Sequence, residues 1–156
     1  FVDVPGFMIG EAAERGGVLR KGGRAMQVMS EVKVPVVTIH TRKAYGMAVS
    51  TTNAPEALGL RLAWPTGEWG DMPAEGAVEA AFRREIAAAP DPDARRREIE
   101  ERLIEDASPW KTAEAFGVEE MIDPAETRFY VARFLEAAAG ALRLQLGPTV
   151  RTAPRV

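Results

Sequence analysis

The sequence predicts an α/β protein with mostly parallel strands. Short apolar stretches alternate with longer amphipathic ones along the 156 residues, which is the pattern of strands joined by helical crossovers. The stretch VPVVTI at 34–39 is β-branched and nearly all apolar, as expected of a strand that is buried on both faces. The chain is long enough to build one core, and its 46% hydrophobic and 28% charged residues are ordinary for a globular domain.

The segment before the buried strand is predicted to be mostly helical. A short strand at 1–4 runs into a Pro-Gly loop, and residues 11–32 then follow a helical pattern. The inner face of this helical segment is expected to comprise Val18, Leu19, Met26 and Met29. Its glycine pairs at 16–17 and 22–23 match no nucleotide-binding motif, so we expect them to mark close backbone packing.

Beyond the buried strand, a turn at Tyr45 and Gly46 is predicted to lead into a short helix at 47–54. A further strand is predicted at 60–66, where Pro65 breaks it.

The second half of the chain is predicted to be largely helical. Helices are expected at 73–88, which Pro73 begins, and at 94–106, which Asp93 caps. Ser108 is expected to cap a short helix that Gly117 closes.

A last strand at 118–123 and a long helix at 124–146 complete the predicted fold, and a loose tail follows. The apolar side of the long helix is expected to comprise Phe129, Val131, Phe134, Leu135, Ala138 and Leu142.

Charge and composition exclude several classes of function. The chain has 20 basic and 23 acidic residues, a net charge of -3, which argues against non-specific nucleic-acid binding and against a polybasic membrane anchor. It contains no cysteine, so disulfides, thiolate zinc sites and a cysteine nucleophile are excluded. No apolar run is long enough to span a bilayer, and we expect a cytoplasmic protein.

Three groups of polar residues are candidate functional sites, and a structural role is the favoured interpretation of each. His40, the single histidine, could be a general base, but no serine or cysteine motif accompanies it. Glu68 and Asp71 could form an acid–base pair, although carboxylates in a Gly-rich loop are more often turn or surface residues. The arginines at 95–97 alternate with glutamates, which indicates an i,i+4 salt-bridged helix face.

The turn at Gly46 is the remaining candidate. A strand followed by a Gly turn and a helix start presents backbone N–H groups that lack intrahelical partners, and the helix dipole adds positive potential there. Such amides can form an oxyanion hole, although many α/β proteins have a Gly turn here for geometry alone.

Several stretches occur together in the order seen in one family: FVDVPGF, GGVLRKGGRAM, VPVVTIHTRKAYGMA, AWPTGEWGDMPAEGAVEAAFRREI and MIDPAETR. In these stretches the chain resembles the C-terminal half of the carboxyltransferase subunit of biotin-dependent acyl-CoA carboxylases, of the propionyl-CoA and methylcrotonyl-CoA carboxylase type. The resemblance implies a crotonase-like fold, a spiral of ββα units. It also implies that residues 1–147 are the biotin-side domain, with a tail at 148–156, and that a CoA-binding N-terminal domain is missing from this sequence.

The resemblance places the biotin-binding amides of the family at the Gly46 turn. The resemblance implies that the backbone amides of Met47 and Ala48 bind the ureido oxygen of biotin, where negative charge develops when the carboxyl group leaves carboxybiotin. The cofactor then carries the chemistry and the protein orients it, so no side-chain base and no metal are expected in this domain. The biotin or substrate side of the site is implied to include Gly6, Phe7, Tyr45, Gly46, Glu75 and Gly76.

The implied substrate is an acyl-CoA. The implied partners are the N-terminal carboxyltransferase half, the biotin carboxylase and biotin carrier subunit, and further copies in a trimer or hexamer. Propionyl-type members commonly read Gly-Gly-Ala-Tyr-Asp where this chain has residues 46–50 as Gly-Met-Ala-Val-Ser, which puts propionyl-CoA in doubt as the substrate. We expect residues 1–156 to be inactive on their own, because the CoA side of the site is absent. Two alternatives remain open: a non-catalytic assembly or docking module, and the carboxyltransferase part of an acyl-CoA decarboxylase.

Overall fold

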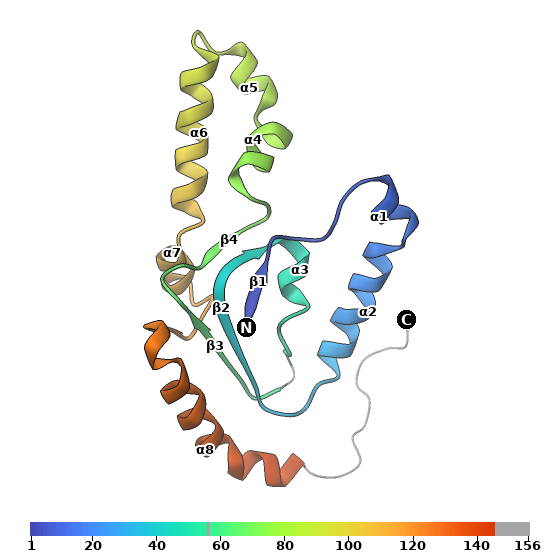
Figure 1. The fold of residues 1–156 in the computed structure, drawn as a ribbon, viewed down its shortest axis with the longest axis vertical. Helices are drawn as coiled ribbons and strands as arrows, with labels where there is room; N and C mark the ends of the chain where they lie inside the picture. Colours follow the sequence, from blue (N-terminus) through green and yellow to red (C-terminus); the bar gives the residue numbers. More distant parts are fainter. Residues whose placement is uncertain (56, 146–156) are drawn as a thin grey trace.

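The structure of the chain is a computed structural model that describes residues 1–55 and 57–145 (Figure 1). Five strands form one sheet in which every pairing is parallel, so the predicted α/β class is confirmed. The strands are β1 (Val2–Val4), β2 (Val36–Tyr45), β3 (Gly59–Ala63), β4 (Glu68–Gly70) and β5 (Glu120–Met121). The helices are α1 (Glu11–Arg15), α2 (Val18–Ser30), α3 (Gly46–Ser50), α4 (Ala74–Ala81), α5 (Arg83–Ala88), α6 (Pro92–Asp106), α7 (Pro109–Glu114), the 3-10 helix η1 (Pro124–Glu126) and α8 (Thr127–Gln145). The expected tail at 148–156 lies outside the described residues.

β2 is the central strand, and it is longer than predicted. β1 lies along one edge of β2, while β3 and β4 share the other edge, and β5 pairs with the far side of β3. β3 pairs with the first half of β2 and β4 with its last three residues, 43–45. The polar stretch at 40–44 was expected to lie between a strand and a helix, but it is strand, because β1 pairs with it from His40 to Ala44.

β4 was not predicted at all. Residues 68–70 are expected in a Gly-rich loop, and a three-residue stretch of Glu, Trp and Gly carries no alternating apolar pattern. Its backbone is extended because its partner is the free edge of β2 beyond the end of β3.

Two separate apolar clusters hold the molecule together. The sheet core comprises Ile39, Leu62 and Ile122, and side chains from the start of α8 pack against it. The hairpin core comprises Val78, Ile86 and Ile99, which join α4 and α5 to α6, with Phe82 and Leu103 packed around them. In Figure 1 this helical hairpin extends away from the sheet, at the end opposite to α8.

Two predicted helical segments are each divided into two helices. The helical segment at 11–32 breaks at Gly16 and Gly17, because Gly17 has a φ of 69° and lies in the left-handed region. The predicted helix at 73–88 breaks at Phe82, which ends α4 and precedes α5. In the second glycine pair only Gly22 marks close packing, since a Cβ there would lie 2.5 Å from the Phe7 ring, whereas a Cβ at Gly23 would have no atom within 4 Å.

The arginine run on α6 forms ion pairs across the hairpin and not mainly along its own helix. Arg95 contacts Glu85 of α5 as well as Glu98, and Arg96 contacts Glu79 of α4. The predicted i,i+4 face is therefore wrong in its partners, because α6 packs side by side with α4 and α5.

The N-cap of α6 is Asp91 and not Asp93. The Asp91 carboxylate accepts a hydrogen bond of 3.0 Å from the Ala94 N–H, and Pro92 occupies the first helical position. Asp93 lies inside the first turn, where its charge only complements the helix dipole.

We expect Asp91→Ala to lower the free energy of unfolding by about 1 kcal/mol, because it removes this cap. Asp93→Ala is the matched control and is expected to cost less, since it removes a dipole interaction alone. Urea denaturation followed by helical circular dichroism measures both changes. An equal loss in the two variants would contradict the assignment of the cap to Asp91.

The end of α7 is closed by a different residue from the one predicted. The Phe116 N–H donates to the Ala113 carbonyl and the Gly117 N–H to the Thr112 carbonyl, which is the Schellman arrangement. The left-handed residue is Phe116, with a φ of 55°, whereas Gly117 provides space, since a Cβ there would lie 2.5 Å from Thr112 Cγ2.

Two predicted inner faces are only partly correct. On α8, Val131 and Phe134 are half-buried and Ala138 is buried, but the remaining three predicted residues are exposed: Phe129, Leu135 and Leu142. Only the beginning of α8 lies against the sheet core, so its later turns have less to cover them. On α2, Leu19 is exposed while the other three predicted residues are half-buried.

Candidate functional site

The carboxyl ends of three parallel strands meet at one point of the sheet. Val4 of β1 is paired with Ala44, and Gly70 of β4 is paired with Tyr45, so both neighbours end level with β2. The backbone then turns through Gly46 into α3. In parallel sheets, ligands characteristically bind beyond the carboxyl ends of the strands.

Gly46 is required at this turn for two reasons. Its φ of 62° lies in the left-handed region, which residues with a Cβ adopt at a cost. A Cβ on Gly46 would also lie 2.9 Å from the backbone carbonyl oxygen of Asp71, which is closer than real Cβ contacts allow. The turn is therefore pressed against the chain that leaves β4.

The two amides after Gly46 have no backbone acceptor among the described residues. Met47 and Ala48 occupy the first turn of α3, where N–H groups have no intrahelical acceptor. Across 1–55 and 57–145, neither amide donates to a backbone group of another element. The Met47 side chain is 54% exposed, whereas Ala48 is 3% exposed and anchors the turn in the protein.

Tyr45, the last residue of β2, connects the turn to β4. Its side chain is buried, and its hydroxyl donates a hydrogen bond of 3.0 Å to Glu68 Oε2. Burial, followed by the neighbouring Glu68 carboxylate, raises the pKa of Tyr45 to about 12. The phenol therefore stays protonated at physiological pH and keeps donating this hydrogen bond.

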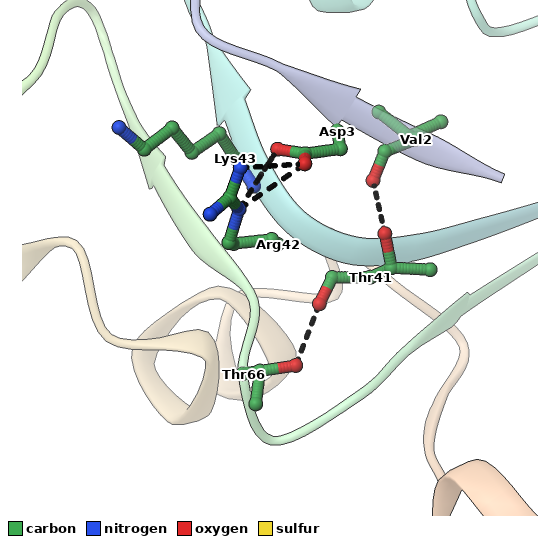
Figure 2. Close-up of polar contacts among 6 residues, drawn as sticks. All are labelled: Val2, Asp3, Thr41, Arg42, Lys43 and Thr66. Carbon is green, nitrogen blue, oxygen red and sulfur yellow. Dashed lines mark hydrogen bonds and ion pairs between the residues drawn. The ribbon is translucent and has the colours of Figure 1, made fainter.

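Side chains fix β2 to β1 on the opposite edge (Figure 2). The Asp3 carboxylate accepts from Arg42 Nε and Nη2 and from the Lys43 backbone N–H. These contacts hold the pKa of the Asp3 carboxyl below its usual range, the Arg42 hydrogen bond contributing most. Thr41 donates to the Val2 carbonyl oxygen, and Thr66 donates to the Thr41 carbonyl oxygen.

The chain matches the family model of the carboxyl transferase domain over residues 1–152. It belongs to the carboxyl transferase domain family. The chain is 45% identical to the propionyl-CoA carboxylase carboxyltransferase subunit of Haloferax mediterranei, over 82% of this chain and 25% of that protein. It is 43% identical to the methylmalonyl-CoA carboxyltransferase 12S subunit of Propionibacterium freudenreichii, over 88% of this chain and 27% of that protein.

A solved structure of the transcarboxylase 12S subunit superposes on this carboxyl transferase chain with a TM-score of 0.81 at 37% identity. The superposition covers 99% of this chain and 29% of that one, so the chain spans little more than a quarter of its relatives. The predicted resemblance and the crotonase-like fold are confirmed.

The structure brings only some of the predicted carboxyl transferase site residues together. Tyr45, Gly46, Met47 and Ala48 are consecutive at the end of β2. Glu75 lies in the first turn of α4, and its charge is close enough to contribute to the raised pKa of Tyr45. The other three predicted residues lie on other segments: Gly76 follows Glu75 on α4, and Gly6 and Phe7 lie in the loop after β1.

The Phe7 ring does not point to a free surface. It lies on Gly22 of α2, where a Cβ would be only 2.5 Å from it, and is half-buried there. Gly6, with a φ of 123°, bends the chain as it leaves the end of β1.

A cavity of about 390 Å³ opens beside the turn, between the end of β4 and the helical hairpin. Its wall is mostly apolar and includes Tyr45, Trp69, Met72, Phe82 and Leu103. Alanines of α4 leave the space open, because larger side chains at those positions would fill it.

The candidate acid–base groups take structural positions in the described residues. His40 is 2% exposed and stacks at a tilt on Trp69, with 5.0 Å between ring centroids. Glu68 was expected at a turn or on the surface, but it is a strand residue that receives the Tyr45 hydroxyl. Asp71 is exposed and contributes its backbone carbonyl to the Gly46 contact. The role of β4 as a support for the turn was missed, since its pairing is non-local.

Among residues 1–55 and 57–145, no cluster of three or more His, Asp or Glu side chains is arranged to hold a metal ion. No helix in the same residues is both long and apolar enough to cross a membrane.

Proposed function

We propose that this chain is the biotin-side part of an acyl-CoA carboxyltransferase. Residues 1–147 form the domain that receives carboxybiotin, and the amides of Met47 and Ala48 bind the ureido oxygen. The observation that carries the proposal is the Gly46 turn at the carboxyl end of β2, where the two following amides have no backbone acceptor among residues 1–55 and 57–145. Family membership supports the same reaction class.

The residues present fit a neutral ureido group. Two preset N–H donors match an acceptor oxygen, and they require no proton transfer from a side chain. Carboxybiotin, when bound, would supply the carboxyl group that replaces a proton on the α-carbon of the acyl thioester, and the ureido nitrogen that loses the carboxyl group would take up that proton. The protein's own part is to aim the donors: Gly46 sets their direction, and buried Ala48 keeps them in place.

Negative charge on the bound oxygen is stabilised by these donors because they need no reorganisation as charge develops. The start of α3 adds positive potential at the same point. Tyr45 stays neutral beside the turn, so it brings no competing negative charge.

The remaining parts of the enzyme are proposed to lie outside residues 1–156, on the same polypeptide or on another. A CoA-binding carboxyltransferase half supplies the acyl-CoA, and a biotin carboxylase and biotin carrier subunit supply carboxybiotin. This division is supported by the extent of the match, since the chain spans 25% to 29% of its relatives. The related transcarboxylase 12S is described as a hexamer assembled as a multienzyme core, and a ring of copies is proposed here as well.

The binding step is tested by titrating the ¹⁵N-labelled chain with biotin methyl ester, which is uncharged like carrier-linked biotin. We expect the Met47 and Ala48 amide resonances to shift saturably. The methyl ester of 2-iminobiotin, in which a nitrogen donor replaces the ureido oxygen, is the matched control and should not shift them. Unmoved Met47 and Ala48 resonances in the folded chain, or equal shifts with both ligands, would refute the proposed site.

Activity is tested in a chimera of the Propionibacterium freudenreichii 12S subunit in which residues 1–147 replace the matching quarter. We expect carboxyl transfer from methylmalonyl-CoA above background, falling by about 10²- to 10³-fold with Ala48→Pro, which deletes one donor. A chimera that assembles but transfers nothing would favour a non-catalytic assembly module.

A further inference from the structure

We propose that Tyr45 and Glu68 are positioning residues that hold the Gly46 turn in register with β4. This inference rests on the proposed function, because the groups that they position are the Met47 and Ala48 amides. Neither side chain is proposed to touch biotin or acyl-CoA.

The two residues join neighbouring strands close to the turn. Tyr45 is the residue before Gly46 and ends β2, while Glu68 begins β4. The hydroxyl of Tyr45 reaches Glu68 Oε2 at 3.0 Å, and the Tyr45 side chain is 4% exposed. This hydroxyl-to-carboxylate hydrogen bond restrains the distance between the two strands.

The rest of the β4 segment contacts the same turn. A Cβ at Gly70 would lie 3.1 Å from Cε1 of the Tyr45 ring, so the ring rests on the Gly70 backbone. The next residue, Asp71, places its carbonyl oxygen 2.9 Å from where a Gly46 Cβ would be. Residues 68–71 therefore form one clamp, which holds the Tyr45 hydroxyl, the Tyr45 ring and the Gly46 backbone.

The clamp is needed because β4 is short. Only three residue pairs join β4 to β2, and β3 has ended before this point. The hydroxyl-to-carboxylate bond adds a side-chain link to these few backbone pairs. A phenylalanine at 45 would fill the same space, so packing alone does not require the hydroxyl.

The test compares Tyr45→Phe with Tyr130→Phe, which removes the hydroxyl of the only other tyrosine. Tyr130 packs at the sheet core, so its variant reports on the general cost of losing a hydroxyl. The readout is the ¹⁵N order parameter of the Met47 and Ala48 N–H groups, measured without any ligand. We expect it to fall from about 0.85 toward 0.6 in Tyr45→Phe and to stay unchanged in Tyr130→Phe.

Two Glu68 variants separate positioning from a loss of fold. Glu68→Gln keeps an acceptor oxygen for the Tyr45 hydroxyl and should preserve the order of the turn, whereas Glu68→Leu should loosen it as Tyr45→Phe does. The amide resonances of Ile39 and Leu62 in the sheet core serve as the folding reference. Unchanged order parameters in both Tyr45→Phe and Glu68→Leu would overturn the proposal.

The chimeric 12S subunit supplies the functional readout. Tyr45→Phe should lower kcat about tenfold with the KM for acyl-CoA unchanged, since a positioning defect acts on the amides and not on CoA. If Tyr45→Phe loosened the turn but left biotin binding and kcat unaltered, the positioning role of Tyr45 would be supported and the proposed amide site would be refuted. If the turn stayed rigid in Tyr45→Phe and biotin still shifted the two amide resonances, the amide site would be supported and the positioning role of Tyr45 would be refuted.

Discussion

Gly46→Ala in the chimeric 12S subunit is expected to reduce carboxyl transfer by about 10²- to 10³-fold. A methyl group at this position meets the Asp71 carbonyl oxygen at 2.9 Å, and a φ of 62° is unfavourable for alanine. The turn must therefore rotate or move away from β4, and either change redirects the Met47 and Ala48 amides. Loss of one such donor costs about 10²- to 10³-fold in rate, which sets the expected magnitude.

Gly23→Ala is the matched control for this variant. Gly23 lies in α2 with no atom within 4 Å of a built Cβ, and its φ is not positive. Alanine there should leave transfer unchanged and stabilise the helix by up to about 1 kcal/mol. If Gly46→Ala retained full transfer activity, the orientation of the two amides would be irrelevant to the reaction.

The stability of the chain is expected to decrease by about 3 kcal/mol as pH falls from 6.5 toward 4, because of His40. Burial, together with the positive charges of Arg61 and the terminal amine, lowers the pKa of His40 to about 4. The folded value lies below the unfolded value of about 6.5, so the stabilisation is complete above pH 6.5 and is lost below it. Protonation would place a charge on a buried Nδ1 that has no partner in the described residues.

Urea denaturation at pH 8, 6.5 and 5 measures this effect, with about 2 kcal/mol of it expected by pH 5. His40→Phe is the control, since it keeps an aromatic ring against Trp69 and removes the only histidine. The Phe variant should show a nearly flat profile over this range. Parallel profiles for the two proteins would assign the pH dependence to carboxylates instead.

The sequence predicted the elements whose signals are local. The buried strand, the Gly46 turn and the long helix at the C-terminal end each follow from residues that lie close together in the chain. The turn amides were predicted for the same reason, since a strand, a glycine and a helix start are adjacent. Pattern alone left their function open, and the family resemblance supplied the biotin hypothesis.

The features that were missed depend on partners far away in the sequence. β4 is extended because it pairs with the edge of β2 that β3 leaves free. The residue types of Glu68 and Gly70 do not predict a strand. Glu68 becomes a partner of Tyr45 only after the two strands pair across 23 positions. The wrong choice of Asp93 as the N-cap has a different cause, since Asp91 and Asp93 both precede helical sequence. Pro92 favours the first helical position, which makes Asp91 the cap.

The separate hairpin core has a consequence for how the molecule unfolds. No buried residue belongs to both the hairpin core and the sheet core in the described part of the chain. The cooperativity that makes a small domain unfold as one unit depends on shared contacts. Here the hairpin is joined to the sheet through β4, which α4 follows and whose Trp69 N–H donates to the Ala107 carbonyl oxygen after α6. We therefore expect the hairpin to unfold as a separate cooperative unit while β2 and the Gly46 turn stay folded. Because Asp91 lies in the hairpin and His40 in the sheet, we expect their variants to report on two different transitions of one polypeptide.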